Sequence, residues 1–257
     1  MLSIVKKIFI KAIGGTRNER IVRARMKIVE EEINPLEDKM RAMTDEEMLE
    51  YSHSLKERMA DGEDRRRILP EAFAMVREAS RRARDHRQFD VQLVAGMILD
   101  EGSVAEEATG EGKTIACYPA IYMAWLEGMH THLVTVNDVL VRRDADFAAP
   151  VFMRLGMTVG YITSEMSSFE RQPMYKCDVT YGTNSEFGFD YLRDNMKLSV
   201  DEQVQSTLDF VIVDEVDSIL IDEARTPLII SGGAHGDVGR FKKVDSVTRE
   251  LIQKNRP

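Results

Sequence analysis

A glycine-rich hexapeptide at residues 109–114, Thr-Gly-Glu-Gly-Lys-Thr, constrains this chain more than any other feature. Gly110 and Gly112 allow a turn whose backbone N–H groups point at phosphate oxygens. Lys113 can reach the β- and γ-phosphates of a nucleotide, and the Thr114 hydroxyl can ligate Mg²⁺. We expect a helix to begin near Lys113, because the dipole at a helix amino terminus favours an anion. The hexapeptide therefore predicts a phosphate-binding loop, the P-loop or Walker A motif.

A second motif follows later in the chain. Residues 210–213 form a short β-branched run of the kind found in buried parallel strands, and Asp214-Glu215-Val216-Asp217 comes directly after it. Asp214 can hold Mg²⁺ through water, and Glu215 can orient or activate an attacking water. A lone glycine-rich loop could be a surface turn, and a lone acidic run could be a solvated one. Together, each after a strand-like run, they indicate a nucleotide-hydrolysing site.

The loop departs from the strict spacing G-x-x-x-x-G-K-[ST]. The first glycine of that pattern would stand at position 107, which is Glu107. Residues 105–114 instead read Ala-Glu-Glu-Ala-Thr-Gly-Glu-Gly-Lys-Thr, the form of the loop that is typical of helicases.

Composition and charge limit the remaining possibilities. The 257 residues suffice for one large domain, or for one domain and part of another. Two cysteines, Cys117 and Cys177, indicate a reducing compartment, and we interpret both as small buried hydrophobes. The net charge of −9 combines +7 over residues 1–29 with −16 over the rest. An acidic body argues against dedicated nucleic-acid binding.

The basic end has an amphipathic pattern. Over residues 2–13, apolar side chains fall on one helical stripe beside Lys6, Lys7 and Lys11. Such a helix can lie on an anionic membrane surface or dock on a partner, and it can equally pack on its own domain. The lysines interrupt any secretory signal, and no apolar run is long enough to span a membrane.

The rest of the chain divides into a helical part and an alternating part. Residues 16–60 read helical with a capping box at 44–47, and a further helix is expected to begin at Pro70 with a basic, solvent-facing end at residues 81–84. From about residue 100, strand-like and helical stretches alternate, which predicts an α/β parallel sheet with crossover helices. We expect strands at 103–107, 131–136, 157–162, 177–181 and 209–213, and helices at 113–127, 138–154 and 184–196. Pro119 should disturb the first of these helices.

Side chains outside the two motifs carry weaker signals. Gln92 can pair with the N6 and N7 atoms of adenine, and Phe89 can stack on the base. By physical chemistry alone, a surface glutamine and a core phenylalanine are the better interpretation. Asn137 or Asp138 is expected to cap a helix, and the five histidines have no spacing typical of a metal site.

Five stretches of the chain carry a more specific signal: Arg87–Leu93, Ala105–Thr114, Val134–Asp138 with Arg143-Asp144, Thr180–Asn195 and Val213–Gly232. Together they closely resemble the SecA family of bacterial preprotein translocase ATPases, and the last two are long and specific to that family. The family usually has histidine at position 88 and glycine at position 95, where this chain has Gln88 and Ala95. The resemblance covers nearly the whole chain.

The resemblance implies a fold, a site and partners. It implies a P-loop NTPase domain of the helicase superfamily 2 type, with a RecA-like parallel sheet, helices on both faces, and helices preceding it. ATP with Mg²⁺ would be held by residues 109–114, including Thr109 and Glu111, and by Asp214, with adenine contacted by Gln92 and Phe89. Glu215 and Lys113 would be the catalytic residues.

In that family, ATP hydrolysis drives unfolded preproteins through the SecYEG channel, and the amino terminus attaches to anionic lipid. We therefore expect a cytoplasmic protein that is peripheral on the cytoplasmic face of the bacterial cell membrane, with residues 1–15 on the phospholipid; homodimer formation stays open. The expected domains are a basic amphipathic segment at 1–30, a first nucleotide-binding domain at 31–232, and the truncated start of a preprotein-crosslinking domain at 233–257.

The second nucleotide-binding domain of the family, with its arginine fingers, is absent from this sequence, so we expect a fragment, a truncated gene product or one piece of a split protein. Two alternatives remain. One is a superfamily 2 RNA or DNA helicase-type ATPase, against which the acidic body and residues 213–232 speak. The other is a fragment that binds nucleotide or membrane without hydrolysing ATP.

Overall fold

The computed structural model of the protein describes residues 15–108, 110–205, 207–231 and 243–249. The chain separates into two compact units, residues 1–226 and 227–257. In the second unit, the described parts are an irregular segment at 227–231 and exposed helical residues at 243–249. The expected basic helix at 2–13 lies outside the described residues. The expected domain boundaries at 30 and 232 stay predictions.

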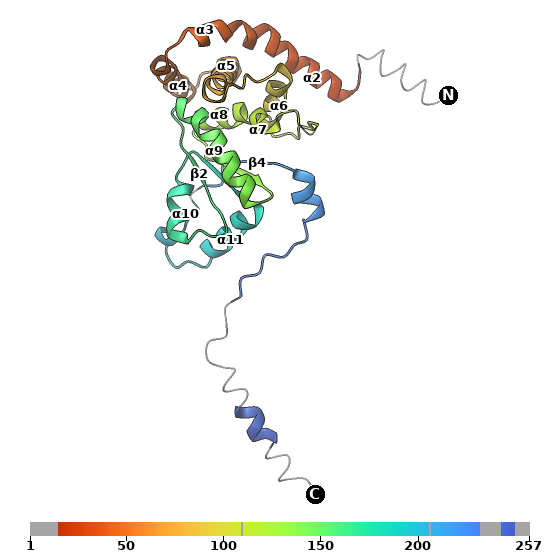
Figure 1. The fold of residues 1–257 in the computed structure, drawn as a ribbon, viewed down its shortest axis with the longest axis vertical. Coiled ribbons are helices and arrows are strands. Elements are labelled where there is room, and N and C mark those ends of the chain that lie inside the picture. The colour runs from red at the N-terminus through yellow and green to blue at the C-terminus, as the bar shows by residue number, and fades with distance from the viewer. Residues whose placement is uncertain (1–14, 109, 206, 232–242, 250–257) are drawn as a thin grey trace, which may run out of the picture. The chain divides into compact units, whose positions relative to one another are not determined.

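The first half of the larger unit is helical, as the sequence predicts (Figure 1). Capping boxes at Thr16 and Thr44 start two of its helices, because in each the carboxylate of a glutamate three residues later accepts a hydrogen bond from the backbone N–H of the cap. The elements are α2 (Arg17–Ile28), the π-helix η1 (Val29–Ile33), the 3₁₀ helix η2 (Asn34–Leu36), α3 (Glu37–Ala42), α4 (Asp45–Ala60), α5 (Arg65–Arg84) and α6 (Asp90–Asp100).

Two expectations for α5 were wrong. The helix begins at Arg65 rather than at Pro70, because Asp64 caps it by accepting from the Arg66 N–H, and Pro70 lies inside. Its basic end does not simply face solvent: residues 81–84 are partly buried, and Arg82 bonds Glu78, Asp45 and the carbonyl oxygen of Met43. Arg82 therefore links α5 to the start of α4 and to the residue that follows α3.

The second half alternates strands and helices around a parallel sheet. The elements are α7 (Lys113–Ala116), α8 (Tyr118–Leu126), β1 (Thr131–Thr135), α9 (Asp138–Arg154), β2 (Val159–Tyr161), α10 (Ser168–Tyr175), β3 (Val179–Thr183), α11 (Asn184–Asp194), the 3₁₀ helix η3 (Val200–Glu202), β4 (Phe210–Val213) and the π-helix η4 (Ser218–Asp222). The strand order is β2-β3-β1-β4, all parallel. An α/β parallel sheet is therefore confirmed.

Helices cover both faces of the sheet. On one face, Tyr181 of β3 and Leu133 of β1 join the main core with α8 and α9. On the other face, His132 of β1 contacts Tyr175 of α10 and Phe187 of α11, with ring centroids 5.7 and 4.7 Å apart. Strand side chains alternate between faces, so one strand serves both layers.

Helix α8 lies at the centre of the main core. All nine of its residues are buried. It packs on α6, α5 and α4 and on β1. The predicted helix at 113–127 is divided at Cys117 into α7 and α8, with Pro119 in the first turn of the second, where its missing N–H costs least.

The predicted strand at 103–107 is wrong. These residues form a loop, and β4 is an edge strand of the sheet. Val104 is exposed. A short run of this kind forms a strand only where a ladder partner is within reach, and here the loop and β4 are separated by the cavity described next.

Candidate nucleotide site

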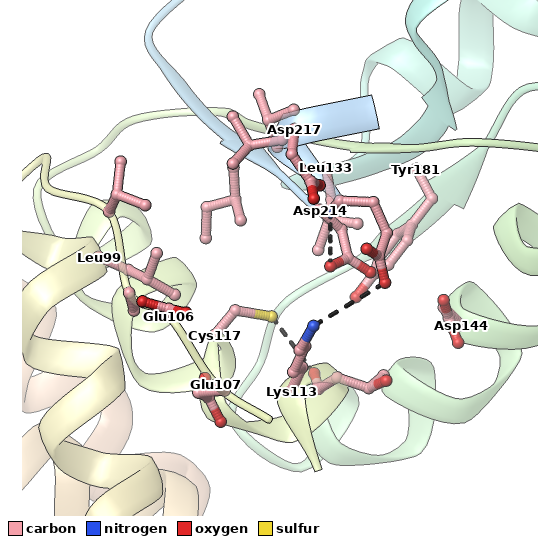
Figure 2. A pocket seen from close by; sticks show the side chains of 17 residues that line it. Leu99, Glu106, Glu107, Lys113, Cys117, Leu133, Asp144, Tyr181, Asp214 and Asp217 are labelled. Carbon is pink, nitrogen blue, oxygen red and sulfur yellow. Dashed lines mark hydrogen bonds and ion pairs between the residues drawn. The ribbon is translucent and has the colours of Figure 1, made fainter. Parts of the chain in front are cut away.

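A cavity of about 450 Å³ opens beside the carboxyl end of β4 (Figure 2). The loop at 104–107 forms one wall, Lys113 and Thr114 of α7 another, and residues 212–217 the third. Leu133 and Tyr181 close the floor from the sheet. The two sequence motifs, distant in the chain, thus line one space, where open α/β sheets bind ligands.

The glycine-rich loop has the conformation that its glycines permit. Gly110 and Gly112 have φ of 89° and 83°, a backbone conformation that residues other than glycine rarely adopt. A Cβ at position 112 would come within 2.4 Å of the Gln92 Nε2 atom. Thr109 lies outside the described residues. The loop ends at Gly112, and α7 begins at Lys113 as expected, although it is only one turn long.

Lys113 faces the acidic motif across the cavity. Its Nζ lies 3.9 Å from Oε1 of Glu215, and both side chains are partly exposed (Figure 2). The Asp214 N–H donates to the Val134 carbonyl oxygen at 2.9 Å, which continues the parallel ladder. The Glu215 N–H then donates to Asp214 Oδ1 at 2.9 Å. Glu215 has φ of 50°, a strained value for glutamate that places its side chain at the cavity.

The lining is strongly acidic. Six carboxylates line the cavity: Glu106, Glu107, Asp144, Asp214, Glu215 and Asp217. Among the described lining residues Lys113 is the one basic side chain. Burial raises the pKa of Glu107, and nearby Lys113 opposes that rise. Burial likewise raises the pKa of Asp144, against the hydrogen bond from Arg143. A phosphate that enters this cavity meets a single basic side chain, Lys113. Further positive charge is needed to offset the phosphate and the six carboxylates.

The residues expected to bind Mg²⁺ fit that ion. The Thr114 hydroxyl and the Asp214 carboxylate line the same cavity. Within the described ranges, no group of three or more His, Cys, Asp and Glu residues is placed to hold a metal by itself. Mg²⁺ is usually bound through one or two protein oxygens, with water and substrate phosphates completing its shell.

The interpretation of Gln92 as a surface residue and Phe89 as a core residue was wrong. Gln92 is 3% exposed, and Phe89 is 68% exposed. Gln92 Oε1 accepts from the Phe89 N–H at 2.8 Å, and Nε2 donates to the Glu111 carbonyl oxygen at 2.7 Å. The side chain thus fastens the start of α6 to the glycine-rich loop.

Nearby contacts hold this arrangement. Gln88 Nε2 donates to the Ile115 carbonyl oxygen at 2.8 Å. A Cβ at Gly96 would lie 2.8 Å from the Ala116 carbonyl oxygen, so α6 approaches α7 closely only because position 96 is glycine. Asn137 caps α9 by accepting from the Leu140 N–H at 2.9 Å, as expected.

Sequence reasoning missed several lining residues. Asp144 and Tyr181 belong to stretches that resemble the family, but neither was assigned to the site, although an aspartate on the buried face of a helix is a detectable signal. Cys117 also lines the cavity, but burial raises the pKa of its thiol, which keeps it protonated. The expectation that Cys117 is buried is confirmed, whereas Cys177 is only partly buried.

Residues 9–256 match one protein family, the SecA DEAD-like domain. The chain belongs to this family. Its fold is accordingly the RecA-like P-loop fold of helicase-type domains, as predicted, and the resemblance seen in the motifs is confirmed.

Relatives that match nearly all of this chain support the same family assignment. A protein translocase subunit SecA from Nitrosomonas europaea is 51% identical over 244 residues, which is 95% of this chain. The subunit of the same name from Neisseria meningitidis is 49% identical over 253 residues, or 98% of the chain. This SecA-family domain spans 27% of the length of each of these relatives.

None of the helices in the described ranges is long and apolar enough to cross a bilayer.

Proposed function

We propose that this domain binds ATP with Mg²⁺ in the cavity beside β4. One observation carries the proposal: Lys113 and Glu215, from motifs far apart in the chain, meet at 3.9 Å across one cavity. In this arrangement Lys113 binds the β- and γ-phosphates in exchange for its contact with Glu215. Glycine-loop N–H groups from Gly110 to Thr114 add further donors, since positive φ at both glycines turns the backbone toward the cavity.

Thr114 and Asp214 are the residues that would hold Mg²⁺, Asp214 through water. When bound, the ion supplies positive charge that offsets the phosphates and the acidic lining. Glu215 acts as the base that orients and polarises the attacking water, for which its strained, cavity-facing position is suited.

Phe89 and Gln92 form the adenine side of the proposed site. The exposed ring of Phe89 is available for stacking. An amide donates two hydrogen bonds and accepts two, so beyond its contacts with Phe89, Glu111 and Gly112 Gln92 keeps one acceptor position on Oε1. Because Gln92 is buried, contact with the base requires the glycine-rich loop to shift, which would link base recognition to the phosphate site.

At the level of the whole protein, we propose that the domain is the first motor domain of a SecA-type translocase. The support is the family, the name of the relatives, and the cavity. Its role would be to couple ATP hydrolysis to transport of unfolded preproteins through SecYEG, from the cytoplasmic face of the membrane. A helicase-type ATPase stimulated by RNA or DNA is less consistent with the net charge of −9.

A second candidate is favoured by one observation. The lining residues that the structure describes include no arginine, whereas phosphoryl transfer commonly uses one to stabilise charge in the transition state. In this candidate the chain by itself binds nucleotide and does not turn it over.

Calorimetric titration with Mg-ADP tests the site. We expect Lys113→Ala to weaken binding at least tenfold, because a hydrogen bond to a charged group contributes about 1.5–3 kcal/mol. Lys176→Ala, at an exposed position outside the cavity lining, is the matched control and should bind like the parent. Equal affinity of the Lys113 variant and the parent would show that the glycine-rich loop is not the site.

Glu215→Gln separates binding from hydrolysis. The amide keeps the shape of the carboxylate but not its charge, so Mg-ADP binding should persist. In an assembly that hydrolyses ATP, the variant should lose more than about nine-tenths of the rate, which corresponds to 1.4 kcal/mol of barrier. Retention of a higher rate would assign water activation to another residue. No hydrolysis by the parent chain alone would support the second candidate.

A further inference from the structure

A second hollow, of about 600 Å³, lies between α2, α6 and the loop at 103–107. Figure 1 places α2 and α6 side by side, and their residues are in contact. Val94 and Ala95 form its buried floor, whereas Val22 and Val91 are 42% and 57% exposed. We call this hollow the α2–α6 groove. An apolar strip of this kind, bordered by polar residues, is typical of a binding surface.

The border of the α2–α6 groove is acidic. Glu101, Glu106, Glu107 and Glu111 line it, and Arg17 is the one basic lining residue among those described. Glu101 is already paired with Arg25 of α2 at 2.8 Å. In the described part of the chain, Glu106, Glu107 and Glu111 form no ion pair. The groove therefore suits an occupant that is both apolar and cationic.

We propose that the α2–α6 groove binds the chain's own amino-terminal segment, residues 1–14. The sequence of this segment has the required chemistry, with Leu2, Phe9 and Ile13 on an apolar stripe beside three lysines. Those three lysines, at positions 6, 7 and 11, equal the three unpaired carboxylates in number and are opposite to them in charge.

The tether also favours this occupant. Residues 17 and 18 line the groove, so the segment is joined to the chain at the groove itself. A short tether gives an effective concentration in the millimolar range, well above that of a separate partner. The extended cap at Thr16 breaks the helix direction before α2 begins, so residues 1–14 do not have to continue its axis.

Docking would connect two parts of the molecule. Residues 104–107 line both the α2–α6 groove and the nucleotide cavity, so an occupant of one touches a wall of the other. The lysines that fill the groove are also those proposed to contact anionic lipid, so the two states exclude each other. Only this exclusion depends on the proposed membrane contact; the docking does not.

Zero-length carbodiimide cross-linking of the full chain, followed by peptide mapping, tests the docking. We expect Lys6, Lys7 or Lys11 to join Glu106, Glu107 or Glu111. Val22→Arg should reduce these links by roughly tenfold, because it places a like charge on the apolar strip. Val139→Arg, at an exposed position on α9, should leave them unchanged.

A mixture of isotopically light and heavy chains shows whether a link lies within one chain or between two. Links found only between chains, or lysines joined indiscriminately to distant carboxylates, would overturn the proposal.

Co-sedimentation with phosphatidylglycerol vesicles tests the exclusion separately. Val22→Arg should bind more tightly than Val139→Arg, severalfold at low salt, because both add one charge but only the first frees the segment. Equal binding by the two variants would contradict the exclusion. If Lys6, Lys7 and Lys11 are changed to glutamine and vesicle binding persists, the membrane contact fails, while the cross-links alone still decide the docking.

Discussion

Charged side chains at the end of β4 line an open cavity with few partners, whereas those between α10 and α11 are buried and paired. At the cavity, Lys113 and Glu215 stand 3.9 Å apart, and both are partly exposed. Between the helices, Arg171 bonds Asp190 at 2.9 Å and the Thr163 carbonyl oxygen at 2.7 Å, and Asp190 is fully buried. Tyr175 adds a further hydrogen bond to Asp190 at 2.8 Å.

The difference separates two uses of the same residue types. The paired charges join α10 to α11 and hold one face of the sheet, where a lost partner leaves a charge away from water. The charges at the cavity have room to change partners, and Glu215 is held with a strained backbone. Such a site is suited to a charged ligand, and it contributes little to folding.

The largest effect that sharpens this comparison is expected at Arg171. Arg171→Ala removes the buried ion pairs with Asp190 and Glu186 and the bond to the Thr163 carbonyl oxygen, so the free energy of unfolding should fall by about 3–5 kcal/mol, although Arg193 still pairs with Asp190. Arg142→Ala is the matched control, because its pair with Glu165 is exposed and should contribute about 1 kcal/mol or less. Urea denaturation followed by circular dichroism measures both. Similar losses in the two variants would erase the distinction between the regions.

A smaller effect is expected from pH at His132, on the same buried face. Burial and the neighbouring His130 lower the pKa of His132 from 6.5 to about 4, against the attraction of Asp209. The unfolded chain therefore takes up a proton below pH 6.5 while the folded chain does not. Stability should be unaffected above that pH and fall as pH drops toward 4, by on the order of 3 kcal/mol in total.

Urea denaturation between pH 7 and 5 measures this dependence. His132→Phe keeps an aromatic ring beside Tyr175 and Phe187 and should flatten the slope. His53→Phe, at an exposed position on α4, should leave the slope as it is. A slope that persists in the His132 variant would assign the loss to other groups.

The sequence predicted much of this arrangement, for identifiable reasons. The apolar runs of β1 and β4 and the caps at Thr44 and Asn137 depend on local patterns, so they were predicted close to their observed positions. The two motifs were also expected to meet, because parallel strands bring their carboxyl ends to one edge. They do line one cavity, although only the acidic motif follows a strand.

The failures share a different cause. Residues 103–107 have a strand-like pattern, but whether they pair is decided by what reaches the edge of β4. Gln92 is buried because its amide donates a hydrogen bond to the carbonyl oxygen of Glu111. The two residues are far apart in the sequence, and no local pattern predicts such a contact. Arg82 was likewise placed by a tertiary partner, Asp45, which a single sequence does not reveal.

Hydrogen–deuterium exchange with and without Mg-ADP tests the central claim most directly, because it reads both regions in one experiment. The account predicts that nucleotide slows exchange at amides of residues 110–117 and 214–217. Exchange across α10 and α11, over residues 168–194, should stay unchanged, since their charges are already paired. Protection confined to α10 and α11, or none at saturating nucleotide, would contradict the assignment of the cavity as the nucleotide site.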